Sequence, residues 1–384
     1  MRQTAIVLTL FGLGCNDSKD TGTEQEVATP VQPIELTSSP EIAGIPVGVR
    51  TIEYAGKTFE VWYPSVEADE QGAAGEMDFK SFIPSSFQEA IDGFSLPTVQ
   101  GTAVPNAPIR DAGQPLPVIL FSHGFGGMRI QSFGLTTHLA SRGYVVIAPD
   151  HPGRMLTDVL PCIFSPPLDG CDLSGFGADP GPDGLAAALQ WVDEANADGE
   201  FLGRLDPELV GIIGHSAGAG SVTSFADTEP RVSAVVPMAG GAVPERDVPT
   251  LRMDGSCDGF VAAADPSTVD GRPMAEFLTI HGAGHLAFSD LCALDIGGFA
   301  DEFLEGRDDL NGLLYPQLRG LGTDGCLGAE PQLVNEDCET SFLPLEDSDT
   351  ITRYYTTVFF DRALKGLESG DDSRVFEAST MYRP

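Results

Sequence analysis

The sequence GIIGHSAGAG, residues 211–220, decides the fold. An apolar run ends at Ile213, and Ser216 then follows, with one glycine two residues before it and another two residues after it. Glycines in these places permit a strained turn and a close approach of neighbouring backbone. Such a turn between a buried strand and a helix exposes the serine oxygen beside the positive end of the helix. The pattern therefore indicates that Ser216 is a nucleophile, rather than a small residue in an ordinary turn.

Strand and helix patterns alternate on both sides of this stretch. Continuously apolar runs predict buried strands over residues 116–124, 144–150, 209–216, 232–240, 250–255 and 276–282. Helical patterns lie near 131–142, through 185–196 and near 352–367. Two β-rich runs, over 48–54 and 59–65, predict an antiparallel hairpin at the edge of the sheet. We therefore expect an α/β fold with a mostly parallel central sheet and helices on both faces.

The loop HGFGG, residues 123–127, follows the first of these buried strands. A nucleophilic serine needs two N–H donors for the negative oxygen that develops on its substrate. We expect the backbone N–H of Ala217, directly after the serine, to be one donor, and that of Phe125 to be the other. The ring of Phe125 is then placed to form a wall of the acyl pocket.

A base and an acid are expected after the serine in chain order. The stretch IHGAGHLAFSD offers His281, which ends a predicted strand, and His285, which lies in the following loop. The stretch PTLRMDGSCDGF offers Asp254 and Asp258 in the same way. Loop residues reach across the sheet edge more readily than residues that close a strand. We therefore favour His285 as the base and Asp258 as the carboxylate that orients it.

The charge of the chain excludes one class of partner. The sequence holds 57 acidic and 21 basic residues, for a net charge of -36. Nucleic acids are bound through clusters of cationic side chains that displace counterions, so a chain of this composition is not expected to bind them. The acidic surface favours solubility instead.

The amino terminus MRQTAIVLTLFGLGC resembles a bacterial lipoprotein signal. Arg2 precedes an apolar stretch that is too short to span a membrane, and Cys15 follows a small residue. The resemblance implies a signal peptide over 1–14, a lipid on Cys15 and a membrane anchor at the bacterial cell envelope, with plain secretion as the alternative. Residues 15–43 then form an acidic tether of disordered composition, and 44–384 form the catalytic domain.

Six further cysteines follow Cys15. An even number in an exported chain predicts disulfides. Short loops favour the disulfides Cys162–Cys171 and Cys326–Cys338. Cys257 is then left to pair with Cys292. No CxxC spacing occurs among these cysteines, so we predict no metal site.

Four stretches of the sequence together resemble proteins of the α/β-hydrolase fold. GVRTIEY…VWYPS, SHGFGGMRIQSFGLTTHLASRGYVVIAPDHPG, GHSAG and GAGHLAFSD are similar to platelet-activating factor acetylhydrolase and dienelactone-hydrolase-like esterases. The resemblance implies a serine carboxylic ester hydrolase that forms an acyl-enzyme and needs no cofactor. Acetylhydrolases carry their acid just after the strand that follows the serine turn. The corresponding stretch of this chain, VVPMAG, has no acidic residue there. The placement of Asp258 is instead similar to bacterial cutinases and polyester hydrolases, which also have a disulfide near the histidine.

The substrate stays open at this point between a small-molecule ester, a phospholipid and a polyester. In polyester hydrolases a tryptophan clamps aromatic polymer at the position of Gly241 here, which argues against that substrate. A further alternative from another class is an inactive surface lipoprotein that uses the fold for binding.

Overall fold

The computed structural model describes residues 45–66, 76–78, 82–83, 98–163, 170–294, 342–367 and 376–384. The chain divides after Pro30 into two units, and all described residues belong to the second, Val31–Pro384. The expected signal peptide and tether lie outside the described residues, so the domain division stays a prediction. Among the described residues, no helix has both the length and the apolar character needed to cross a bilayer.

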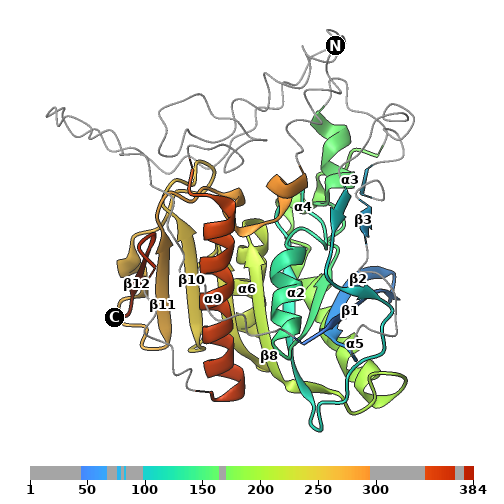
Figure 1. Ribbon diagram of the computed structural model, residues 1–384. Coiled ribbons are helices and arrows are strands. Elements are labelled where there is room, and N and C mark those ends of the chain that lie inside the picture. The colour runs from blue at the N-terminus through green and yellow to red at the C-terminus, as the bar shows by residue number, and fades with distance from the viewer. Residues whose placement is uncertain are drawn as a thin grey trace, which may run out of the picture. The chain divides into compact units, whose positions relative to one another are not determined.

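Ten strands form one sheet in the order β12-β11-β10-β9-β8-β6-β7-β2-β1-β5 (Figure 1). Its six central strands pair in parallel: β6 (Leu116–Ser122), β7 (Val145–Pro149), β8 (Leu205–His215), β9 (Val232–Met238), β10 (Thr250–Gly255) and β11 (Ala275–Ile280). Their carboxyl ends therefore meet at one edge of the sheet.

Antiparallel strands extend the sheet on both sides. The predicted hairpin consists of β1 (Val47–Tyr54) and β2 (Lys57–Pro64), and β2 runs antiparallel to β7. Beyond it, the short strand β5 (Val104–Pro105) pairs in parallel with β1. At the opposite edge, β12 (Ser379–Tyr382) pairs antiparallel with β11. A separate two-stranded sheet contains β3 (Glu76–Asp78) and β4 (Thr98–Gln100).

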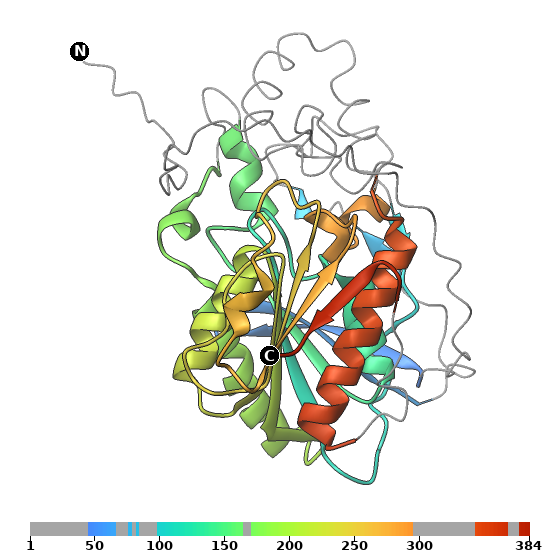
Figure 2. The ribbon, with the colours of Figure 1, turned by 90° about the vertical axis from the view of Figure 1, so that its left-hand side faces the viewer.

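Helices cover both faces of the sheet, as Figures 1 and 2 show. One face carries α2 (Phe133–Ser141) and α9 (Leu345–Lys365), and the other carries α5 (Gly181–Ala197) and α6 (Ala217–Thr228). Shorter helices lie in the connections: α3 (Leu156–Val159), η3 (Leu160–Ile163), α4 (Ser174–Gly177), η4 (Pro266–Val269), η5 (Leu286–Phe288) and η6 (Leu291–Leu294). The predicted α/β fold class, with helices on both faces, is confirmed.

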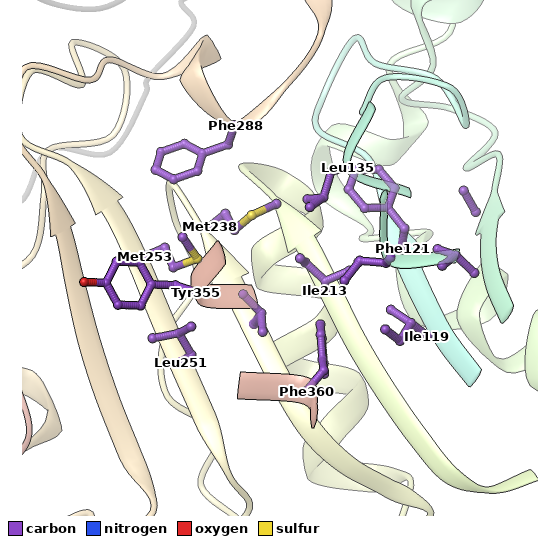
Figure 3. Close-up of a cluster of buried hydrophobic side chains, with 14 of the residues drawn as sticks. Ile119, Phe121, Leu135, Ile213, Met238, Leu251, Met253, Phe288, Tyr355 and Phe360 are labelled. Atoms are coloured by element: carbon purple, nitrogen blue, oxygen red, sulfur yellow. The ribbon is translucent and has the colours of Figure 1, made fainter. Parts of the chain in front are cut away.

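The alternation of side chains along each strand builds two hydrophobic cores, one on each face. In β6, Ile119 and Phe121 belong to the core under α2 and α9, whereas Val118 and Leu120 belong to the core under α5 and α6. Figure 3 shows part of the first core, with Ile213 from β8 and Phe360 from α9 on the same side of the sheet. Full burial of an apolar side chain of this size stabilises the fold by about 1.5–3 kcal/mol.

Candidate active site

Ser216 occupies the turn between β8 and α6. Its backbone has φ 56° and ψ -119°, a positive φ that costs a residue with a Cβ about 1–3 kcal/mol. A Cβ on Gly214 would clash with the backbone of Gly218, and a Cβ on Gly218 would clash with the carbonyl of Ser122. The turn therefore requires both glycines. It places Ser216 directly at the N-terminus of α6, where the helix dipole favours negative charge.

Asp258 and His285 form a buried pair. His285 Nδ1–H donates to Asp258 Oδ2 at 2.8 Å, and both residues are buried. The other oxygen, Asp258 Oδ1, accepts the backbone N–H groups of Phe260 at 2.8 Å and of Val261 at 2.7 Å. The ring of Phe260 packs on the imidazole, with 5.2 Å between ring centroids. These contacts hold the carboxylate and the imidazole in a single orientation.

The two alternative residues lie in other surroundings. Asp254 forms an ion pair with Arg252, whose Nη2 lies 3.0 Å from its Oδ2, and it accepts the N–H of Ala264 at 2.9 Å. Burial raises the pKa of the Asp254 carboxyl above its usual value. His281 Nε2 lies 2.7 Å from the hydroxyl of Thr380 on the edge strand β12. The structure thus brings Asp258, and not Asp254, to His285.

The loop of His285 is bonded to the serine turn. His215 Nε2–H donates to the carbonyl oxygen of His285 at 2.8 Å. The rings of these two histidines also pack against each other, with 4.8 Å between centroids. Because His215 directly precedes Ser216, this contact places His285 beside the strained turn.

The loop after β6 lies against the same turn. A Cβ built on Gly124 would lie 3.3 Å from the Cβ of Ser216. The carbonyl oxygen of Gly124 accepts His123 Nδ1–H at 2.8 Å and the N–H of Gly127 at 3.2 Å. In a trans peptide the N–H points opposite to the carbonyl, so the N–H of Phe125 points away from the His123 ring. Phe125 is 38% exposed, so it stands open to solvent beside the serine turn.

Two buried histidines flank the site as neutral hydrogen-bonding groups. Burial lowers the pKa of His123 and that of His215 to about 3. Both rings are therefore uncharged at neutral pH, and each keeps one N–H donor and one acceptor nitrogen. This leaves His285 as the histidine beside Ser216 that is bonded to a carboxylate.

Arg154 is a residue of this region that sequence reasoning missed. It is 1% exposed, and its Nη2 donates to Ser122 Oγ and to the carbonyl of His123, both at 2.9 Å. Its Nη1 donates to Asp179 Oδ1 at 2.7 Å and to Ser221 Oγ at 2.8 Å. The guanidinium thus ties the loop after β6 to α6. No local pattern around Arg154 signals this, since its partners come from three other segments.

The cysteines agree with the predictions in part. Cys162 and Cys171 form the predicted disulfide. Cys257 and Cys292 are each disulfide-bonded, but their pairing with each other stays a prediction. The remaining cysteines, Cys15, Cys326 and Cys338, lie outside the described residues. Within the part of the chain that the structure describes, no group of three or more His, Cys, Asp or Glu side chains is arranged to hold a metal ion.

Comparisons with known proteins agree with this architecture. The family model for platelet-activating factor acetylhydrolase, isoform II, matches residues 56–157, and the model for the alpha/beta hydrolase fold matches residues 117–288. Among solved structures, a ferulic acid esterase from Streptomyces cinnamoneus is similar, with a TM-score of 0.54 and 21% identity over 94% of this chain and 99% of that one. No curated protein matches the sequence. The strand order, the serine turn and the fold model over residues 117–288 together identify the α/β-hydrolase fold in this chain.

Proposed function

We propose that this chain is a serine carboxylic ester hydrolase that works through an acyl-enzyme. The observation that carries the proposal is the hydrogen-bonded pair of Asp258 and His285, anchored through His215 beside the strained turn of Ser216. A serine next to an oriented imidazole at a helix N-terminus is the arrangement that nucleophilic acyl transfer requires.

In the acylation step, His285 Nε2 takes the proton of Ser216 Oγ while Oγ attacks the carbonyl carbon of the ester. The electron pair of the carbonyl bond moves to its oxygen, and the backbone N–H groups of Ala217 and Phe125 stabilise the oxyanion. When this intermediate collapses, the bond to the alcohol breaks and His285 gives its proton to the leaving oxygen. Asp258 keeps the imidazole in the required tautomer throughout, because it accepts Nδ1–H.

In the deacylation step, water replaces the alcohol. His285 accepts a proton from the water, whose oxygen attacks the acyl carbon, and the second oxyanion uses the same two N–H donors. Collapse releases the carboxylic acid and returns the proton to Ser216. The cycle uses no cofactor, because every proton and electron pair is supplied by the side chains, the ester or water.

A small-molecule ester is the substrate class we propose, with a phospholipid as the alternative that the acetylhydrolase model over residues 56–157 favours. The surroundings of Gly241 argue against an aromatic polyester. Its φ is +67°, and a Cβ there would lie 2.6 Å from the carbonyl oxygen of Ala219. An aromatic clamp at this position would therefore require the backbone to move.

We also propose that the enzyme is exported and anchored through a lipid on Cys15. The disulfide between Cys162 and Cys171 supports an oxidising compartment. The intact mass of protein extracted from membranes tests the anchor, and an unmodified Cys15 in a soluble product would contradict it.

The reaction itself is tested by Ser216→Ala. Loss of the nucleophilic oxygen is expected to lower kcat by about 10⁴–10⁶ on a p-nitrophenyl ester while the protein stays folded. Ser224→Ala, at an exposed position of the same helix, is the matched control and is expected to keep wild-type activity. Wild-type turnover in Ser216→Ala would mean that another residue is the nucleophile.

Two further assays separate the alternatives. A fluorophosphonate probe is expected to label the wild type and Ser224→Ala but not Ser216→Ala, whereas an inactive binding lipoprotein would not be labelled in any form. A chain-length series of p-nitrophenyl esters, assayed beside a phospholipid and a polyester film, defines the substrate class.

A further inference from the structure

Gln131 links two parts of the proposed site that lie far apart in the chain. It is 2% exposed and lies just before α2. Its Oε1 accepts the N–H of Gly124 at 3.0 Å, in the loop that carries Phe125. Its Nε2 lies 2.7 Å from His215 Nδ1, beside Ser216. The side chain thus bridges the loop after β6 and the serine turn.

These contacts determine the orientation of every group in the chain of hydrogen bonds. A backbone N–H can only donate, so the oxygen of the Gln131 amide must face Gly124 and its NH₂ group must face His215. His215 Nδ1 is then an acceptor, and its Nε2 carries the proton of the neutral ring. That proton is donated to the carbonyl of His285 at 2.8 Å. The path therefore runs from Gly124 through Gln131 and His215 to His285 without a conflict of donors.

The backbone around Gln131 binds the same histidine loop a second time. The N–H of Asp290 donates to the carbonyl of Gln131 at 2.9 Å, and Ser132 Oγ donates to the carbonyl of Phe288 at 3.1 Å. The segment just after His285 is therefore held by the segment that holds Gly124. A displacement of one loop would be passed to the other.

Space for the glutamine is built into the loop after β6. A Cβ on Gly127 would clash with Oε1 of Gln131. Removal of the amide would leave the N–H of Gly124 and Nδ1 of His215 buried without their present partners, and a buried polar group that loses its partner is costly. The arrangement is therefore sensitive to the loss of this one side chain.

We propose that Gln131 is a positioning residue for catalysis: through His215 it fixes the loop after β6, which carries Phe125, and the loop of His285 relative to each other. This inference rests on the function proposed above. Gln131 touches neither substrate nor nucleophile in this role, and it acts on the geometry of the transition state. Groups that position an oxyanion donor and a base affect the transition state more than the bound ester.

The test compares Gln131→Met, a near-isosteric change that removes both hydrogen bonds, with Gln190→Met on the exposed face of α5 as the matched control. Active sites are titrated with a fluorophosphonate, so that kcat is expressed per functional site. Gln131→Met is expected to lower this kcat by about 10–100-fold with KM changed by less than about twofold. The affinity of a boronic acid, which forms a tetrahedral adduct, is expected to fall by the same factor.

A double-mutant cycle tests the path itself. His215→Phe keeps a ring against Phe288 and His285 but removes both hydrogen bonds of His215. If the two residues act along one path, the kcat of the double variant is no lower than that of the less active single variant. If they act independently, the two fold-losses of kcat multiply. If Gln131→Met does not fold, the single variant His215→Phe tests the inference by itself. It breaks the same path of hydrogen bonds and is expected to give the same loss of kcat at constant KM.

Three results would overturn the inference: kcat per titrated site equal to that of Gln190→Met, a loss carried by KM alone, or multiplying losses in the double variant. A lower melting temperature with unchanged kcat per site counts as the first of these, because it assigns Gln131 a structural role. Failure of the proposed function is recognised separately, since a wild type without hydrolytic activity or fluorophosphonate labelling removes the reaction itself.

Discussion

Replacing Asp290 with asparagine is expected to remove a pH-dependent cost from the fold. Asp290 lines a cavity of about 240 Å³ between η5 and α9, and its Oδ2 accepts the N–H of Gly134 at 2.7 Å. Burial raises the pKa of its carboxyl from 3.8 to about 7. The nearby charge of Asp349 also raises this pKa, while the N–H of Gly134 and the charge of Arg353 lower it. The fold therefore disfavours the charged form of Asp290.

The direction and the size of the expected change in stability with pH follow from this pKa shift. A carboxyl whose pKa is higher in the folded than in the unfolded chain gives its full stability below pH 3.8, and this stability is lost as the pH rises through about 7. A shift of about three units corresponds to roughly 4 kcal/mol, of which about 2–3 kcal/mol is lost between pH 5 and 8. Because Asp290 keeps some contact with solvent, screening reduces the expected change to about 1–2 kcal/mol.

The assay is urea unfolding under non-reducing conditions, followed by the fluorescence of Trp62 and Trp191, at pH values from 5 to 8. The unfolding free energy of Asp290→Asn minus that of the wild type is expected to grow by about 1–2 kcal/mol over this range. Asparagine can still accept the N–H of Gly134 through its side-chain oxygen. Asp247→Asn, at an exposed position, is the control and is expected to give a flat difference. A flat difference for Asp290→Asn would refute the reasoning.

Two further predictions separate the members of each candidate pair. His285→Ala is expected to reduce kcat by about 10⁴–10⁶, and His281→Ala much less, because the latter contacts Thr380 at the edge of the sheet; the reverse ranking in an ester assay would mean that the base is His281. Asp258→Asn is expected to lower kcat by about 10³–10⁴ through the wrong imidazole tautomer, whereas Asp254→Asn is expected to lower the melting temperature and to keep most of the kcat per titrated site, since it disrupts an ion pair. Equal kcat losses in both aspartate variants would argue against the assigned acid.

The sequence by itself determined the fold class and the serine turn, because both depend on local patterns. Continuous apolar runs specify strands that are buried on both faces, and five of the six predicted in this way lie within two residues of the observed bounds. The glycine at 214 is required by the backbone of Gly218, which belongs to the same short segment, whereas Gly218 itself is required by the carbonyl of Ser122 on β6. The contact of Gly214 involves residues that are close in the chain, so a pattern of a few letters carries the necessary information.

Other elements exceeded what local patterns indicate. The helix α9 begins at Leu345, seven residues before the expected start at 352, because its polar first turn is stabilised by packing that buries Asp347 and Ser348. The strand β8 likewise begins at Leu205 rather than at 209, where it extends its pairing with β6. The edge strand β12 was not expected, since four residues become a strand only by pairing with β11.

Only the tertiary structure decided which side chains of the site meet. The sequence favoured His285 over His281 and Asp258 over Asp254 only by their predicted places in loops. The 2.8 Å contact of His285 with Asp258 shows that these two side chains meet. Gln131 and His215 are 84 residues apart in the chain and 2.7 Å apart in space. The physical reason is that hydrogen-bond partners across the edge of a parallel sheet are brought together by the order of the strands, and strand order is a property of the whole packed core rather than of any single segment.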